Sequence, residues 1–476
     1  MEQSGFIVAI DLGTSKIVGL LGRKNAQGVI SVLASEVVSS DSSIKHGIVY
    51  NIDEVAGKIK KIVNLLENKS GKKIGKVYVS IAGQSLRAIE HVQTRALSGE
   101  SEVTFQDIDQ MEQLARQNKP EFFANYSVVA PEIFLDGVHV DSEEDAIGKQ
   151  ASLIEGRYRL IVGRPNIKSN LVKCITDRNS LEIAGFIVGP VAAGAIVLDD
   201  EDKNAGCALV DFGAGTTTVS VYKDGLLRYM SVIPFGGRTI TRDVQSLGFV
   251  DAAAESYKIK YGKLGKDKSK PNGQVASDVD LKELNKVIQL REEEIILNVI
   301  NQIKESGYAD QLGAGIIIVG GASQLDGLPE FFADKAKMPV KRGVVKRLYI
   351  NNAADLLQNP VYTQALGLLL FSNENCEKKE HQREVNYQHD RHFNAPNADS
   401  FNRVQRDESK PAEHKVEKPV EIVEEDVYSG EESEADDKHT KKSNKKEKKE
   451  DTKQRTLFDF FGKIQNLGGT MFKDEE

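Results

Sequence analysis

The chain has 476 residues, a formal net charge of −8 at neutral pH and 28% charged residues. That length predicts roughly two to four domains, and the acidic balance argues against broad binding to nucleic acid. There is no N-terminal charged-plus-apolar signal and no apolar run of about eighteen residues, so we expect neither secretion nor a membrane span. The scattered cysteines, Cys174, Cys207 and Cys376, are expected to be small apolar residues rather than redox or metal groups.

A short apolar run near the N-terminus ends in an acidic, glycine-containing turn. Residues 6–10 predict a buried strand, and the sequence continues Asp11-Leu12-Gly13-Thr14-Ser15. Glycine lets backbone approach a phosphate closely, while hydroxyl and N–H groups donate to its oxygens. An aspartate at the strand end can hold Mg²⁺ through water, because this ion keeps much of its hydration. For the next residue, Lys16, a phosphate contact and a solvated position are both open.

Residues 189–195 contain small residues and precede an expected helix. Residues 207–217 then repeat the N-terminal pattern, with an apolar strand, Asp211 and a turn that contains Gly213, Gly215 and Thr216. One such turn is weak evidence for a phosphate site. Two turns in matching strand contexts predict a duplicated pair of domains that closes on a nucleotide.

Three further segments complete the expected folded part. Residues 281–305 predict a long helix, and the charges in its middle, at residues 291–294, are expected on a solvated face, with a partner contact for Arg291 as the alternative. Residues 315–319 predict a strand that ends in Gly320-Gly321-Ala322, where backbone can lie against an adenine or its ribose. A plain strand-to-helix turn is the alternative. Residues 362–370 predict a helix whose small residues allow close packing against another helix.

Composition changes after Phe371. Residues 372–476 contain 20 Lys/Arg and 26 Asp/Glu, a net charge of −6, which leaves −2 for the first 371 residues. Residues 372–454 show almost no apolar clustering, so we expect a disordered charged linker.

The last twenty-two residues predict an amphipathic helix. A membrane-surface helix is favoured over a core element or a protein-docking helix, because a lysine-rich block at residues 441–453 precedes it and would be attracted to anionic lipid. Lys463 would lie on the polar side. The apolar side would consist of Leu457, Phe458, Phe460, Phe461, Ile464 and Leu467.

These elements, in this order, resemble the actin–hexokinase–chaperone ATPase superfamily and, within it, the FtsA family of bacterial cell-division proteins. The finer resemblance rests on residues 233–243, on residues 254–262 (AESYKIKYG), and on residues 77–83 with 103–108. It implies an α/β fold of two ribonuclease-H-type domains around a nucleotide cleft. The implied organisation is a first lobe at 1–83 and 160–203, an insert subdomain at 84–159, a second lobe at 204–371 with a small subdomain at 236–312, the linker at 372–454 and a membrane-targeting helix at 455–476.

The resemblance also implies residue roles around ATP and Mg²⁺. Asp11 and Asp211 would orient Mg²⁺ through water. Glu255 would accept from the ribose, and Lys258 would flank the adenine, although from the residues alone this pair is typical of an exposed i, i+3 ion pair. The phosphates would be held by Gly13, Thr14 and Ser15 from one side and by Gly213, Gly215 and Thr216 from the other, and the base would rest on Gly320, Gly321 and Ala322.

The implied function is assembly on the cytoplasmic face of the bacterial inner membrane, at the division septum. The implied partners are the C-terminal peptide of the tubulin-like protein FtsZ in the Z ring, further copies of the chain in a filament, anionic lipid and later division proteins. No segment identifies a group that would orient the attacking water, so we expect at most a slow ATPase. The alternatives are a PilM-like pilus-assembly protein, a small-molecule kinase and, less favoured because of the polar tail, a chaperone ATPase.

Overall fold

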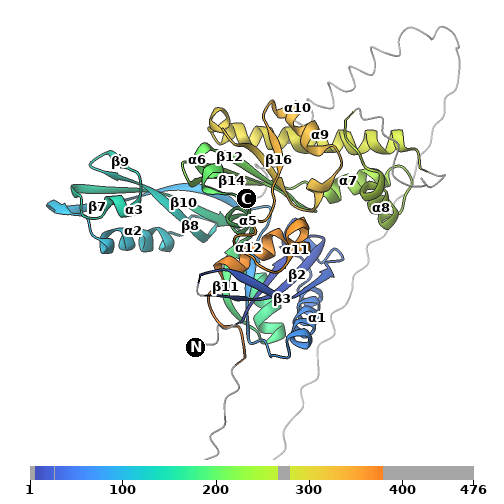
Figure 1. Cartoon of the computed structure of the whole chain (residues 1–476), viewed down its shortest axis with the longest axis horizontal. Coiled ribbons are helices and arrows are strands. Elements are labelled where there is room, and N and C mark those ends of the chain that lie inside the picture. Colours follow the sequence, from blue (N-terminus) through green and yellow to red (C-terminus); the bar gives the residue numbers. More distant parts are fainter. Residues whose placement is uncertain (1–5, 26, 266–278, 379–476) are drawn as a thin grey trace, which may run out of the picture. The chain divides into compact units, whose positions relative to one another are not determined.

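The computed structural model describes residues 6–25, 27–265 and 279–378 (Figure 1). The predicted linker beyond residue 378 and the predicted membrane helix at 455–476 lie outside the described residues. Among the residues that are described, no helix is both long and apolar enough to cross a membrane.

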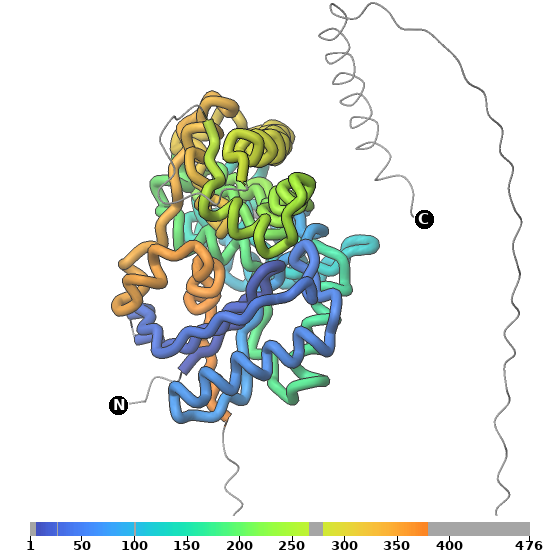
Figure 2. The backbone as a smooth tube through the Cα atoms, turned by 90° about the vertical axis from the view of Figure 1, so that its right-hand side faces the viewer, coloured from blue at the N-terminus to red at the C-terminus, as the bar shows by residue number. Residues whose placement is uncertain are grey.

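The first sheet has five strands in the order β11-β6-β1-β2-β3. Its central strand pairs antiparallel with β2 and parallel with β6. Helix α1 (Ile52–Ser70) lies alongside the sheet (Figure 2), with its buried side chains three or four residues apart. The strands are β1 (Phe6–Leu12), β2 (Lys16–Lys24), β3 (Ile30–Ser39), β6 (Lys76–Ile81) and β11 (Glu182–Val188).

The second sheet repeats this arrangement in the order β14-β13-β12-β15-β16. Its central strand, β12, pairs antiparallel with β13 and parallel with β15, as β1 does with β2 and β6. The sequence-based strand at 315–319 and long helix at 281–305 are confirmed. The elements are β12 (Cys207–Phe212), β13 (Thr217–Lys223), β14 (Leu226–Ile233), β15 (Gly315–Val319), β16 (Val340–Arg342) and α9 (Leu281–Glu305).

Two apolar helices, α5 (Gly189–Val197) and α12 (Thr363–Phe371), cross at small residues. A side-chain carbon at Gly367 would overlap the Ala192 carbonyl, so glycine is required for this close approach. The predicted close helix packing is therefore confirmed. Residues 189–195 are themselves helical instead of preceding a helix.

A third sheet, in the order β7-β10-β8-β9, has its own core around Met111, Ile154 and Tyr158. It also contacts β14, where Arg228 pairs with Glu132 at 2.5 Å. Its elements group together in Figure 1: β7 (Arg87–Glu102), α2 (Phe105–Gln117), β8 (Ala124–Leu135), β9 (Val138–Val140), α3 (Glu143–Ala146) and β10 (Gln150–Gly163).

Short elements connect these sheets. They are β4 (Ile44–Lys45), β5 (Ile48–Val49), α4 (Asn166–Val172), the π-helix at Lys173–Asp177, α6 (Asp200–Ala205), α7 (Gly237–Gln245), α8 (Asp251–Tyr261), α10 (Leu328–Ala336) and α11 (Ala354–Gln358), with single 3₁₀ turns at Ala309–Gln311, Gly321–Gln324 and Pro360–Tyr362.

The linker begins later than the composition indicates. Residues 373–378 lie against the first sheet, where the Cys376 N–H donates to the Phe6 carbonyl at 2.8 Å and the Gly75 N–H donates to the Cys376 carbonyl at 2.9 Å. The Tyr78 hydroxyl accepts from the N–H groups of residues 373 and 374. The boundary at Phe371 is therefore wrong, because backbone pairing and one buried cysteine hold a polar segment that residue counts cannot distinguish from a linker.

Candidate functional site

The two glycine turns have the same backbone geometry. The Gly13 N–H donates to the Lys16 carbonyl at 2.9 Å, and the Gly213 N–H donates to the Thr216 carbonyl at 2.9 Å. A side-chain carbon at either glycine would lie 2.8 Å from that same carbonyl oxygen. Both turns therefore depend on glycine for a tight hairpin at the strand end.

The two turns also touch each other. A side-chain carbon at Gly215 would lie 2.6–2.9 Å from the Thr14 side chain. The Thr14 hydroxyl accepts from the Gly47 N–H at 2.9 Å, and His46 Nδ1 donates to the Gly215 carbonyl at 2.9 Å. The sequence patterns did not identify His46, which lies in a two-strand turn without a phosphate-binding pattern.

Each strand end presents an aspartate, supported in a different way. Ser80 donates to the Asp11 carboxyl group, and Gln364 donates to Asp211 Oδ2 at 2.6 Å. Burial raises the pKa of Asp11 to about 6, with Ser80 lowering it and Asp211 raising it further. Burial also raises the pKa of Asp211, partly offset by Gln364. Neither supporting residue was predicted.

The predicted base platform lies against the second strand end. Gly320 has a φ of +88°, and a side-chain carbon there would overlap Asp211 Oδ1 and lie 2.5 Å from the Phe212 carbonyl. Gly321 instead has nothing within 4 Å of such a carbon. The first glycine thus secures the strand end, while the second faces open space.

Helix α7 begins directly on the second turn. The Gly237 N–H donates to the Gly213 carbonyl at 3.0 Å, and the Arg238 N–H donates to the Ala214 carbonyl at 2.7 Å. These bonds fix the second turn from outside its own hairpin. Ala214, which departs from the glycine usual in the resembled family, contributes only its backbone to them.

Helix α8 contributes Glu255 and Lys258, whose side chains are 2.8 Å apart. The i, i+3 ion pair is therefore present and exposed on one side only: the Glu255 side chain is 37% exposed, whereas the Lys258 side chain is 12% exposed and also donates to Gly237 O and Thr241 Oγ1. Burial lowers the pKa of Lys258, and Glu255 partly offsets this. Burial raises the pKa of Glu255, but the lysine and Thr241 outweigh it and leave that pKa below its usual value.

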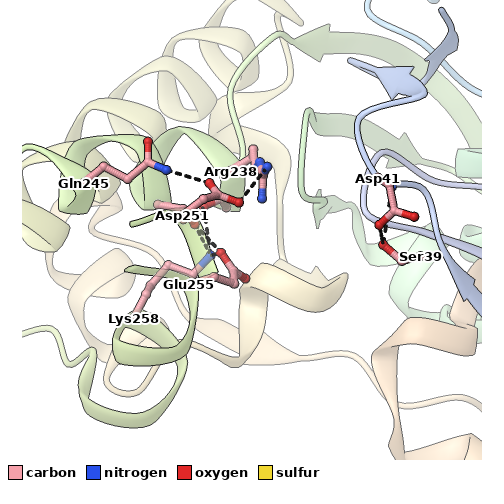
Figure 3. A network of polar contacts seen from close by, with 9 residues as sticks. Ser39, Asp41, Arg238, Gln245, Asp251, Glu255 and Lys258 are labelled. Carbon is pink, nitrogen blue, oxygen red and sulfur yellow. Dashed lines mark hydrogen bonds and ion pairs between the residues drawn. The ribbon is translucent and has the colours of Figure 1, made fainter. Parts of the chain in front are cut away.

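Figure 3 shows these side chains on one wall of a cleft, with Asp41 on the opposite wall. Arg238 pairs with Asp251 at 3.0 Å, and Gln245 donates to Asp251 at 2.7 Å. The opposite wall comes from the end of β3, where Ser39 donates to Asp41 at 2.5 Å.

The cleft measures about 2200 Å³ and brings all the sequence-predicted phosphate, metal, ribose and base residues together. Lys16 lies on the lining with an exposed side chain. The individual ligand roles remain predictions. The residues are Asp11, Gly13, Thr14, Ser15, Lys16, Asp211, Gly213, Gly215, Thr216, Glu255, Lys258, Gly320, Gly321 and Ala322.

The solvated face predicted for the middle of the long helix is wrong at Glu292. This side chain is 1% exposed, and neither carboxyl oxygen has a hydrogen-bond partner among the described residues. Burial raises the pKa of Glu292 to about 8, partly offset by Lys258. Its neighbour Arg291 pairs with Asp243 at 2.5 Å, within the same chain.

The duplicated sheets, the two glycine turns and the crossed helices give the chain an actin-like fold. A solved PilM–PilN type IV pilus biogenesis complex is similar, with a TM-score of 0.56 and 16% identity over 77% of this chain and 98% of that chain. This similarity concerns the fold alone.

Sequence similarity is more specific. The sequence model of the protein family described as cell division protein FtsA matches residues 208–367 of this chain. Cell division protein FtsA of Porphyromonas gingivalis is 33% identical over 331 residues, covering 67% of this chain and 68% of the relative. The protein of the same name from Neisseria meningitidis is 30% identical, and the match covers 77% of this chain and 90% of that relative. The chain belongs to the FtsA family of cell-division proteins.

Proposed function

We propose that this chain is an ATP-binding, actin-like division protein that polymerises on the cytoplasmic membrane, anchors FtsZ there and helps to recruit later division proteins. The contact between the two glycine turns, at Thr14 and Gly215, is the observation that carries the proposal. It brings two matching phosphate-type turns, each with an aspartate, to one cleft. Family membership supports the division role.

The cleft residues fit Mg²⁺ and ATP. The turns at Gly13 and Gly213 are tight hairpins that line the cleft and leave no room for a side chain at either glycine, and Gly321 faces open space. Asp11 and Asp211 offer carboxylates suited to a hydrated Mg²⁺. When bound, the metal would neutralise phosphate charge.

The residues of the chain then link nucleotide binding to closure. Backbone N–H and hydroxyl groups of both turns hold the phosphates, while Lys258 and Glu255 hold the base side. Occupation of both turns favours the closed state, because the nucleotide contacts both sides only there. We expect slow turnover, because none of the residues assigned to the nucleotide would deprotonate or orient the attacking water.

Nucleotide binding to the full chain tests the first part. Asp11→Asn and Asp211→Asn are expected to weaken binding of a fluorescent ATP in Mg²⁺, while Asp41→Asn, an exposed carboxylate at the cleft edge, retains it. Steady-state phosphate release should be slow. Equal binding by all three variants would contradict the nucleotide role, and rapid release would contradict slow turnover.

Sedimentation with anionic liposomes, ATP and an FtsZ C-terminal peptide tests the second part. Wild type is expected to bind liposomes and peptide. A chain that ends at Gln454 and the variant Phe461→Glu should lose the liposomes, while Phe105→Glu, which adds the same charge at an exposed site of α2, should keep them. A PilM-like role predicts neither interaction, and a small-molecule kinase predicts rapid turnover with a phosphate acceptor.

A further inference from the structure

Gln364, near the start of α12, reaches from one connecting helix to the second strand end. Its Nε2 donates to Asp211 Oδ2 at 2.6 Å. The other end of the same amide lies over Gly189, where a side-chain carbon would overlap Gln364 Oε1. The amide therefore fills the space between the first residue of α5 and the Asp211 carboxyl group.

Both oxygens of Asp211 are restricted as a result. Oδ2 accepts from Gln364, and Oδ1 lies so close to Gly320 that no side chain fits there. The carboxylate is therefore hydrogen-bonded at one oxygen and packed against Gly320 at the other. A hydrogen bond to a charged group is also stronger than one between neutral groups.

The position of the amide depends on the helix crossing. Residues 365–369 of α12 are buried, and Gly367 lies directly against the Ala192 carbonyl of α5. Gln364 is thus carried on a helix that cannot shift along α5 without moving the amide. The crossing of the two helices sets where the donor to Asp211 lies.

We propose that Gln364 is a positioning residue, which orients the Asp211 carboxylate for hydrated Mg²⁺ and ties that orientation to the packing of α5 against α12. This inference rests on the proposed ATP and Mg²⁺ binding. A purely structural role for Gln364 would give a different result, because packing loss weakens nucleotide binding equally with and without the metal.

The test measures the affinity of the full chain for ATP in Mg²⁺ and in EDTA, together with the thermal midpoint of the ligand-free chain. Gln364→Leu keeps a similar size but cannot donate. It is expected to weaken binding in Mg²⁺ by about ten-fold, the usual scale for a hydrogen bond to a charged group, and to leave binding in EDTA nearly unchanged. Gln358→Leu, the same change at an exposed cleft residue, should leave both affinities unchanged.

Gln364→Glu is the second variant, because it keeps the shape of the side chain and replaces the donating amide with a carboxyl group beside Asp211; the thermal midpoint shows whether it is folded. It is expected to reduce the Mg²⁺-dependent gain in affinity at least as much as leucine does. An unchanged ratio of the two affinities in either folded variant overturns this inference alone. If wild type binds no ATP in Mg²⁺ or EDTA, the proposed function fails and this inference fails with it.

Discussion

The two sides of the cleft repeat one hairpin but hold it differently. On the first side, Asp11 is supported by Ser80 from the neighbouring strand of its own sheet, and Ser15 at the turn is exposed. On the second side, Gln364 and Gly320 fix Asp211, and α7 binds the turn carbonyls. The same side also carries two ionisable side chains with little exposure, Lys258 and Glu292. The first turn is held from outside its hairpin as well, since Ser40 donates to the Gly13 and Ser15 carbonyls and the Gly47 N–H donates to the Thr14 hydroxyl. A duplicated motif can therefore keep its backbone while the elements that support it differ.

The largest expected effect separates the two glycines that follow β15. Gly320→Ala should destabilise the chain by about 3 kcal/mol, because alanine is strained at a φ of +88° and its side chain overlaps Asp211 and Phe212. Gly321→Ala is the matched control and should stay within about 0.5 kcal/mol. Urea unfolding of the full chain measures both, and similar losses would show that the second side does not depend on this contact.

Glu292→Gln tests the cost of the buried charge on the second side. With a pKa of about 8 in the folded chain against 4.5 in the unfolded chain, Glu292 binds a proton more tightly when folded. The stability that the Glu292 carboxyl group contributes to wild type is therefore lost as pH rises from 4.5 through 8, whereas a glutamine at this position does not titrate. The free energy of unfolding of the variant, relative to that of wild type, should therefore rise by about 1 kcal/mol per pH unit between pH 5 and 8. Urea unfolding at each pH measures it.

The neighbouring variant Glu293→Gln provides the control for that pH series. Glu293 pairs with Lys335 and is 31% exposed, so this variant should show no comparable trend. A pH-independent difference between wild type and Glu292→Gln would contradict the buried-charge account.

Equivalent positions of the two turns should respond unequally. Gly215→Ala places a carbon 2.6–2.9 Å from the Thr14 side chain and forces the turns apart, which should cost about 2 kcal/mol and weaken nucleotide binding. Ser15→Ala, at the matching exposed position, should leave stability unchanged and weaken nucleotide binding only through the loss of its hydroxyl donor. Thermal unfolding and ATP titration measure the difference, and equal effects would mean that the turns are interchangeable.

The smallest effect is expected on the first side. Ser80→Ala removes the donor to Asp11 and the acceptor for the Leu12 N–H, which lies 3.1 Å away, and should cost about 1 kcal/mol in unfolding experiments. Ser39→Ala, on an exposed strand end, is the control. A loss as large as that of Gly320→Ala would remove the contrast between the sides.

Local patterns predicted the strands, the long helix and the cleft residues, because each depends on nearby sequence. Apolar runs predicted β1 and β12, the first strand of each hairpin, and the bounds of α9 match the expected helix. Ser80, His46 and Gln364 were missed since they reach the site only through tertiary packing. Their own neighbourhoods contain no phosphate or metal pattern.

Glu292 could have been found from the sequence. Buried residues of α9 recur at Leu284, Ile288, Ile295 and Val299, and position 292 falls on the same stripe at helical spacing. The surrounding run of charges concealed that periodicity. The boundary at Phe371 failed for another reason: hydrogen bonds between backbone groups leave no trace in composition.

The hydrogen bonds that hold residues 373–378 against the first sheet determine which part of the protein first bears a pull on the segment that follows them. Whatever residues 379–476 bind, a pull on them is transmitted first to the beginnings of β1 and β6 through Cys376, Phe6 and Gly75. The sheet that carries Asp11 is then the held end. Among the described residues, 373–378 make no hydrogen bond to the sheet that carries Asp211, so such a pull acts on the first sheet before it acts on the second.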